Sequence, residues 1–105
     1  LAARGSISHE LIVDRVCHAP ADIFGVEERG YVREGYFADL VIIDPDKPVT
    51  VDSADVLYKC GWSPFEGHTF TSSIDTTIVN GEVVWKNGAL TGAIAGKRLN
   101  FSRPR

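Results

Sequence analysis

The longest apolar run of the chain is Leu40-Val41-Ile42-Ile43, which lies between Asp39 and Asp44. Branched aliphatic residues in a short run that ends at Asp44-Pro45 are typical of a β-strand. Because the run is apolar at every position rather than at alternate ones, it indicates cover on both faces of the strand. We therefore expect a buried core strand inside a sheet, with the other elements packed against it.

The pattern before this run is helical. Apolar residues recur at roughly helical spacing from Ile7 to Ala19, and Ser8 is suited to cap the first turn. Pro20 cannot continue that helix but can begin another one at its first position. Gly25 suits the left-handed residue that ends a helix. The sequence thus predicts a helix over residues 8–18 and a short second helix that ends before Gly25.

After Val26 the pattern changes to short strands separated by turns. A strand at Tyr31-Val32 is predicted to lead into a tight turn over residues 33–36, in which Gly35 takes a positive φ. Asn80-Gly81 is the strongest hairpin signal, and Asn87-Gly88 turns the chain again. The remaining predicted elements are strands at 49–51, 69–73, 74–79 and 82–86, and a short helix at 53–59 capped by Asp52 or Ser53. Residues 89–105 are weakly patterned, and their last few residues are expected to be loose.

Composition bounds what such a chain can be. It has 105 residues, which fits one small domain, and a chain of this length buries only about 60–70% of its unfolded surface. The formal net charge of -3 does not indicate the basic surface that binding to nucleic acid or to an anionic membrane needs. No apolar run approaches the length of a membrane span, and no signal peptide is recognisable at the start. The chain contains no Met, which favours a piece cut from a longer protein.

The two cysteines, Cys17 and Cys60, form neither a disulfide framework nor a metal motif. We interpret them as two free buried thiols in a reducing cytoplasm, with a disulfide bridge as the alternative.

No constellation of residues indicates an active site. His9, His18 and His68 lie far apart in the sequence and belong to no HxH, HExxH or CxxC pattern. Cys17 and His18 are neighbours on a helix and point in different directions, so they do not make a nucleophile and its base. No glycine-rich nucleotide motif and no GxSxG sequence occurs. We therefore predict no catalytic, no substrate-binding and no metal-binding residue in this chain.

One loop stands out for a different reason. Residues Gly61 to Gly67 carry Trp62 and Phe65 between glycines and a proline. Large aromatic side chains in such a loop usually anchor it to another surface.

Four motifs, in this order, resemble the C-terminal end of the cyclic amidohydrolases, the family of dihydroorotase, dihydropyrimidinase and allantoinase. The motifs lie at residues 20–25, 30–44, 59–67 and 77–84, reading PADIFG, GYVREGYFADLVIID, KCGWSPFEG and TIVNGEVV. The third motif is most similar to that of class I dihydroorotases, and allantoinases come second. The resemblance covers nearly all of residues 6–88.

The resemblance implies a particular architecture for the parent protein. Members of the family have a (β/α)8 barrel whose metal ligands are an HxH pair, a carboxylated lysine, two further histidines and an aspartate. None of these motifs is present here. Residues 1–25 would then be the last helical segment of the barrel. Residues 26–105 would be the C-terminal half of a composite β-sandwich that flanks it. The expected fold is mainly β with an N-terminal α-helix.

The function implied by the resemblance belongs to the parent. The parent would interconvert carbamoyl aspartate and dihydroorotate in pyrimidine biosynthesis, with zinc in its barrel, while this chain would be a non-catalytic fragment without a cofactor. Alternatives are a fragment of allantoinase or dihydropyrimidinase, a fragment of a catalytically dead relative, and a stand-alone β-rich interaction domain. The expected partner is the remainder of the parent chain. Because a fragment would leave an apolar helix face and a strand edge uncovered, self-association is also expected.

Overall fold

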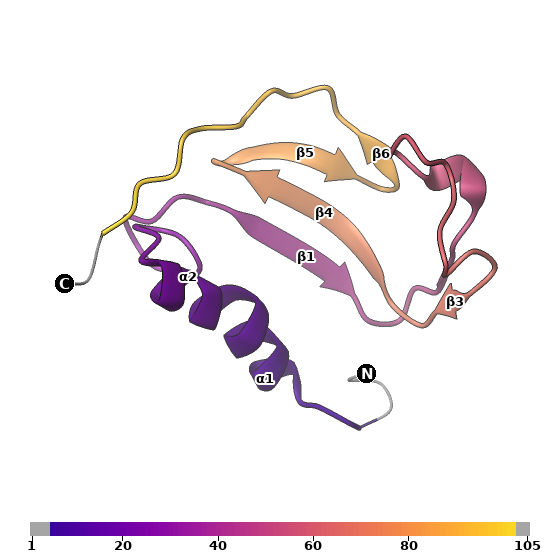
Figure 1. Ribbon diagram of the computed structural model, residues 1–105, viewed down its shortest axis with the longest axis horizontal. Coiled ribbons are helices and arrows are strands. Elements are labelled where there is room, and N and C mark those ends of the chain that lie inside the picture. Colours follow the sequence, from indigo (N-terminus) through magenta and orange to yellow (C-terminus); the bar gives the residue numbers. More distant parts are fainter. Residues whose placement is uncertain (1–4, 103–105) are drawn as a thin grey trace.

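The computed structural model of the protein describes residues 5–102. A helical segment comes first, and nearly all regular structure after it is β (Figure 1). The prediction of a mainly β fold with an N-terminal helix is therefore confirmed. In Figure 1 the helical segment lies on the side of the sheet nearest strand β1, and the C-terminal tail returns to the end of α2.

The helical segment has three consecutive parts: α1 (His9–Val13), a π-helical turn η2 (Asp14–His18) and α2 (Ala19–Phe24). Its start is as predicted, because the backbone N–H of Leu11 donates to the Ser8 side chain at 3.1 Å. Its end is also as predicted, since Gly25 has a φ of 65° and takes the left-handed conformation.

The predicted second helix is confirmed, since α2 has Pro20 in its first turn. No break separates it from α1, because the π-helical turn η2 joins the two. In the π-helical turn the N–H of Ala19 bonds the carbonyl of Asp14, five residues back. The turn widens just before the proline, whose missing N–H falls in the first turn of α2, where it costs little.

The main sheet is antiparallel and has the strand order β1-β4-β5-β6. Its strands are β1 (Leu40–Asp44), β4 (Ser73–Val79), β5 (Glu82–Lys86) and β6 (Ala89–Leu90). The hairpin of β4 and β5 forms as predicted: Val79 lies opposite Glu82, and Asn80 and Gly81 have φ values of 50° and 82°. The second turn, Asn87-Gly88, joins β5 to β6 in the same way.

Strand β1 exists as predicted but does not lie inside the sheet. It is an edge strand that pairs only with β4 within residues 5–102. The side chains of Val41, Ile42 and Ile43 are 54%, 50% and 59% exposed. The expectation of a covered strand is wrong for this chain, because the described residues supply a partner on one side and little cover on either face.

A two-stranded ribbon of β2 (Val49–Thr50) and β3 (Thr69–Phe70) lies at the end of the molecule away from α2 (Figure 1). The helix predicted over 53–59 is only a short 3-10 turn, η3 (Ser53–Asp55). Asp52 caps it, since its carboxylate accepts the N–H of Ala54 at 3.0 Å. The rest of the segment up to His68 is irregular.

The predicted strand at Tyr31-Val32 does not form, and residues 27–39 are a loop. Val26 instead makes an isolated β-bridge with Phe101 of the C-terminal tail. The N–H of Glu27 donates to Asn100 at 2.9 Å, and the N–H of Ser102 donates to Gly25 at 2.8 Å. The tail therefore pairs with residues 25–27 rather than with Tyr31-Val32. The turn with Gly35 is confirmed, with Tyr36 N–H bonded to Arg33 O and a φ of 83° at Gly35.

Burial is sparse throughout the described part. Ala21 is its one buried hydrophobic residue, and the buried polar residues are Arg29 and Thr76. No helix within residues 5–102 has the length and apolar character needed to cross a membrane. Residues 103–105, part of the end that we expected to be loose, lie outside the described residues.

Candidate functional site

The histidines and cysteines do not gather into one place. His18 stacks on Tyr31 with ring centroids 4.0 Å apart, and His68 meets the ring of Phe70 edge-on at 4.5 Å. Cys17 and Cys60 are free but exposed, so their predicted burial is wrong. Within residues 5–102 no three His, Cys, Asp or Glu side chains are grouped so that they could hold a metal ion. The donor set of an amidohydrolase metal centre therefore does not fit this part of the chain.

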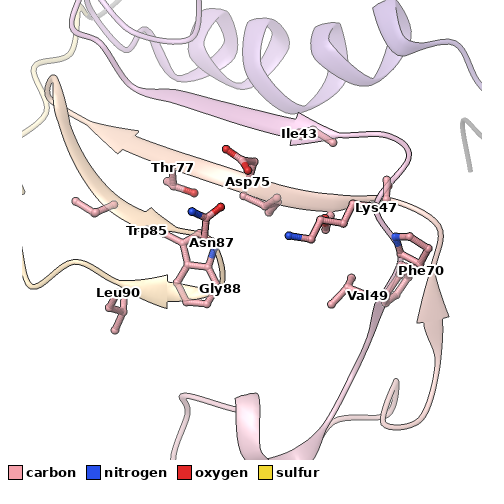
Figure 2. A pocket seen from close by; sticks show the side chains of 15 residues that line it. Ile43, Lys47, Val49, Phe70, Asp75, Thr77, Trp85, Asn87, Gly88 and Leu90 are labelled. Atoms are coloured by element: carbon pink, nitrogen blue, oxygen red, sulfur yellow. The ribbon is translucent and has the colours of Figure 1, made fainter.

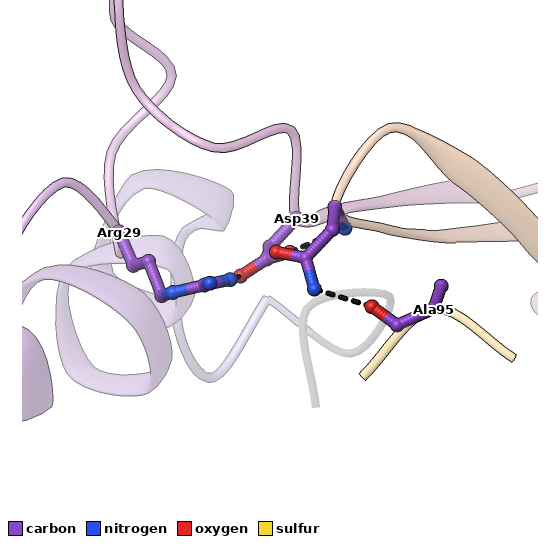
Figure 3. Close-up of polar contacts among 4 residues, drawn as sticks. Arg29, Asp39 and Ala95 are labelled. Atoms are coloured by element: carbon purple, nitrogen blue, oxygen red, sulfur yellow. Dashed lines mark hydrogen bonds and ion pairs between the residues drawn. The ribbon is translucent and has the colours of Figure 1, made fainter. Parts of the chain in front are cut away.

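The polar centre of the described structure is an ion pair between Arg29 and Asp39 (Figure 3). Nη1 of Arg29 donates to Oδ2 of Asp39, and Oδ1 of Asp39 accepts the backbone N–H of Asn80 at 2.8 Å. Partial burial acts to raise the pKa of Asp39. The hydrogen bond from Asn80 and the Arg29 guanidinium outweigh burial, so the pKa of Asp39 is lowered.

Arg29 is unusually buried for a cation, with 7% of the residue exposed. Its guanidinium carbon lies 4.1 Å from the centroid of the Phe37 ring, which adds a cation–π contact to the ion pair. Its Nη2, and Oδ1 of Asn80, are buried without a hydrogen-bond partner among the described residues. The amide nitrogen of Asn80 donates to the carbonyl of Ala95, which ties the hairpin turn to the C-terminal tail.

A second, exposed cluster surrounds Tyr31. Its ring lies between His18 and the guanidinium of Arg33, whose central carbon is 4.0 Å from the Tyr31 centroid. The Tyr31 hydroxyl donates to Asp22 at 2.6 Å, and this hydrogen bond raises the pKa of Tyr31. The cluster joins α2 to the loop after it and contains no nucleophile or metal-ligand set.

One face of the sheet is hollowed. Ile43, Trp85 and Leu90 line a concavity of about 750 Å³, together with Val49 and Phe70 of the small ribbon. Figure 2 shows β5 and its turn on one side of this concavity, and β2 and β3 on the other. We call it the sheet hollow. Lys47 and Asp75 are among its few charged lining residues, so it suits apolar side chains better than a polar small molecule.

Two further apolar surfaces are uncovered. Val16, Ile23 and Phe24 expose most of their area along the helical segment. Trp62 and Phe65 are more than half exposed in the loop before β3, although the ring of Phe65 lies 5.9 Å from that of Phe70 between centroids.

The model of the amidohydrolase family matches residues 2–85. The chain belongs to the amidohydrolase family. It is 38% identical over 98 residues to a dihydroorotase of Halobacterium salinarum, an alignment that covers 93% of this chain and 23% of the relative. An allantoinase of Desulfitobacterium hafniense is 33% identical, covering 74% of this chain and 17% of the relative. Among solved structures, the L-hydantoinase (dihydropyrimidinase) from Arthrobacter aurescens superposes with a TM-score of 0.77 and 34% identity.

This amidohydrolase chain spans only about a fifth of the proteins it matches. The L-hydantoinase alignment covers 85% of this chain and 20% of that structure. The family match and the similar proteins agree with the resemblance that the four sequence motifs indicate.

Sequence reasoning missed Arg29 and the side chain of Asn80 as organising residues. No sequence pattern singles out Arg29, and the pattern at Asn80 indicates only its backbone conformation in the turn. Their partners are ten and fifteen residues away in sequence, and no local pattern encodes such pairs.

Proposed function

We propose that this chain is a non-catalytic C-terminal portion of a dihydroorotase-type amidohydrolase. Residues 1–25 form the last helical segment of the barrel, and residues 26–105 form the C-terminal half of the flanking β-sandwich. The parent interconverts carbamoyl aspartate and dihydroorotate. The observation that carries the proposal is the near absence of a core: Ala21 is the one buried hydrophobic residue between residues 5 and 102.

The large accessible surface area of the chain supports the proposal that a partner covers part of it in the parent protein. The chain exposes 8457 Å², whereas a folded monomer of this length exposes roughly 5800 Å². The excess is on the scale of surface that permanent interfaces bury. A stand-alone interaction domain would be expected to cover its own strands and helix, so this alternative is disfavoured.

The uncovered surfaces match the two halves of the proposed parent. The apolar side chains Val16, Ile23 and Phe24 suit a helix that packs on barrel strands. The free edge of β1 and the sheet hollow suit the strands and apolar side chains of the other half of the sandwich. The proposed partner is thus the remainder of the parent chain.

Zinc in this proposal belongs to the parent barrel. Metal ions in such barrels polarise the bond to be cleaved and activate water. No group of three His, Cys, Asp or Glu side chains within 5–102 could hold the ion. In this proposal the barrel of the parent supplies the metal ligands and the catalytic residues. The two free thiols are compatible with a reducing compartment, and we place the parent in the cytoplasm.

A chimera tests the proposal. The segment of the Halobacterium salinarum dihydroorotase that aligns with this chain is replaced by this chain, and hydrolysis of dihydroorotate and bound zinc are measured. We expect the chimera to bind zinc and turn over dihydroorotate, the same enzyme without the segment to be inactive, and this chain alone to do neither. Stoichiometric zinc and hydrolysis by this chain alone would contradict the proposal, as would a folded, zinc-loaded chimera without activity.

The second candidate is a parent of the allantoinase or dihydropyrimidinase type, and it rests on the allantoinase and L-hydantoinase similarities. Grafting this chain into both of those enzymes as well gives a matched comparison. If the second candidate holds, the dihydroorotase chimera should lose far more of its host's activity than the other two lose.

A further inference from the structure

The junction between the helical segment and the sheet depends on few contacts. α2 ends at Phe24 and β1 begins at Leu40, and the strand that packs extensively on β1 is β4 rather than any helix. The fifteen intervening residues, 25–39, form one isolated bridge and otherwise turns and loop. The most buried side chain of this stretch is that of Arg29. The contacts that hold the helical segment in position relative to the sheet therefore lie largely in this loop.

Arg29 and Gly30 contact the two sides of the junction. A Cβ on Gly30 would overlap Cβ of Ala21 and would lie 2.8 Å from the carbonyl oxygen of Cys17, so the backbone at Gly30 packs directly against the helical segment. The neighbouring Arg29 side chain reaches the other way, to the carboxylate of Asp39 just before β1. Two consecutive residues thus connect the helix to the first strand.

The same carboxylate holds the hairpin turn. Asp39 accepts the N–H of Asn80 at 2.8 Å, and the N–H of Gly81 donates to the carbonyl of Ala38 at 3.0 Å. The side-chain amide of Asn80 also donates a hydrogen bond to the carbonyl of Ala95, which connects the C-terminal tail to the same cluster (Figure 3). Four segments meet here: the loop after α2, the start of β1, the β4–β5 turn and the tail.

We propose that Arg29, Asp39 and Asn80 form a clasp that sets the orientation of the helical segment and of the C-terminal tail relative to the sheet. Arg29 is a positioning residue that acts through Asp39, and Asn80 positions the tail. The clasp keeps the apolar side of the helix and the free edge of β1 in one fixed arrangement. That this arrangement fits a single partner, the barrel and N-terminal strands, rests on the proposed function, whereas the clasp itself does not.

Distance measurements in the 105-residue chain test the clasp. Spin labels are placed at Cys17 on the helical segment and at Glu82→Cys on β5, with Cys60→Ser to remove the third thiol; Cys17, Cys60 and Glu82 are all exposed. The distance distribution between the labels is measured by pulsed electron paramagnetic resonance. The doubly labelled chain is diluted with unlabelled chain, so that self-association adds no distances between labels on different copies. We then expect one narrow distribution, because the clasp holds helix and hairpin together.

Arg29→Gln should broaden this distribution, since Gln keeps much of the length of Arg but loses the charge and the planar contact with Phe37. Arg33→Gln is the matched control, because Arg33 lies in the same loop and is exposed, with its guanidinium over Tyr31. The control should keep the narrow distribution, and Arg29→Lys should restore part of it. Amide chemical shifts of residues 73–90 report whether the hairpin is intact in each variant.

Asn80→Gly tests separately the two hydrogen bonds of Asn80 in the clasp, the one from its backbone N–H to Asp39 and the one from its side-chain amide to Ala95. Gly tolerates the positive φ of Asn80 and retains the backbone N–H to Asp39, but it loses the bond to Ala95. A label at Lys97→Cys, paired with Cys17, should then show a broader distribution, while the pair of Cys17 and Glu82→Cys stays narrow.

A narrow Cys17–Glu82 distribution in Arg29→Gln with an intact hairpin would overturn the clasp. If Arg29→Gln fails to fold, Asp39→Asn provides the second variant, because its amide removes the charge at nearly the same shape, and an unchanged narrow distribution there would also overturn it. Neither outcome bears on the chimera of the preceding subsection, and an inactive chimera leaves these distances unaffected.

Discussion

The β4–β5 hairpin and strand β1 lie in one sheet but differ in the number of strands beside them and in how much of their surface is buried. β4 has a strand on each side, and β5 lies between β4 and β6. Thr76, near the middle of β4, is buried. β1 has one neighbouring strand, and its three central side chains are half exposed or more. The hairpin is closed by its own turn residues, whereas the apolar side chains of β1 are only half covered by residues 5–102.

This difference shows that the sequence carries two kinds of information, one about local turns and one about which segments need cover. Turn residues act locally, so Asn80 and Gly81 specify the hairpin wherever the rest of the chain lies. An apolar run specifies only that a strand should be covered, not which residues cover it. The helical segment resembles β1 in this respect, since Val16, Ile23 and Phe24 are exposed on it.

The largest effect is expected at the junction of the helix and the loop. Gly30→Ala would place a Cβ 2.8 Å from the Cys17 carbonyl oxygen at a φ of 85°. Backbone atoms cannot yield as a flexible side chain can, so we expect a loss of about 3 kcal/mol or more of unfolding free energy. Gly35→Ala is the matched control, because Gly35 has a φ of 83° but no atom within 4 Å, and it should lose only about 1 kcal/mol. Urea denaturation measures both, and equal losses would contradict close packing at Gly30.

The next effect concerns the uncovered strand. We expect this chain alone to self-associate at micromolar concentration, because an unprotected apolar edge pairs with other chains. Ile42→Lys should weaken association about tenfold, which corresponds to about 1.4 kcal/mol. Ile94→Lys is the control, since Ile94 is 96% exposed in the tail and lies outside the strands. Sedimentation velocity across a concentration series measures this, and a monomer at every concentration would show that β1 does not drive association.

The hairpin should respond to its turn. Gly81→Val places a branched side chain at a φ of 82° where open space surrounds the position. The cost is therefore backbone strain without a clash, on the order of 1 kcal/mol or more. Thermal denaturation measures it, and an unchanged melting temperature would argue against the turn as the determinant of the hairpin.

The smallest effect is expected from pH. The lowered pKa of Asp39 means that its contribution to stability is complete above the unfolded pKa of about 3.9 and is lost as pH falls through the folded value. The side chain is 31% exposed, so solvent screening should keep the loss below about 1 kcal/mol. Urea midpoints between about pH 5 and pH 2 should fall less for Asp39→Asn than for the native chain. Identical pH profiles would show that Asp39 contributes nothing to this dependence.

Local chemistry explains which structural predictions were right. Ser8 at the helix start, Gly25 at its end, Gly35 in its turn and the Asn80-Gly81 hairpin all depend on residues within a few positions of one another. The errors arose where distant residues decide. No strand forms at Tyr31-Val32, and the bridge that does form nearby joins Val26 to Phe101, which is 75 residues away.

The candidate site could be predicted only in part. The family resemblance came from short segments of the sequence, and the family match confirms it. The Arg29 clasp could not be found in this way, because its members come from four segments that only the fold brings together. The π-helical turn that joins the two helices was not predicted, because such a turn has no recognised sequence signal.

Amide hydrogen exchange compares the two regions most directly. In this chain alone, below the concentration of self-association, we predict slow exchange for the paired amides of β4 and β5 and fast exchange for the β1 amides that point away from β4. In the dihydroorotase chimera those β1 amides should become as slow as the hairpin, if the proposed strand of the parent covers the edge. Equal protection of β1 and the hairpin in this chain alone, or β1 amides that stay fast in an active chimera, would contradict the account.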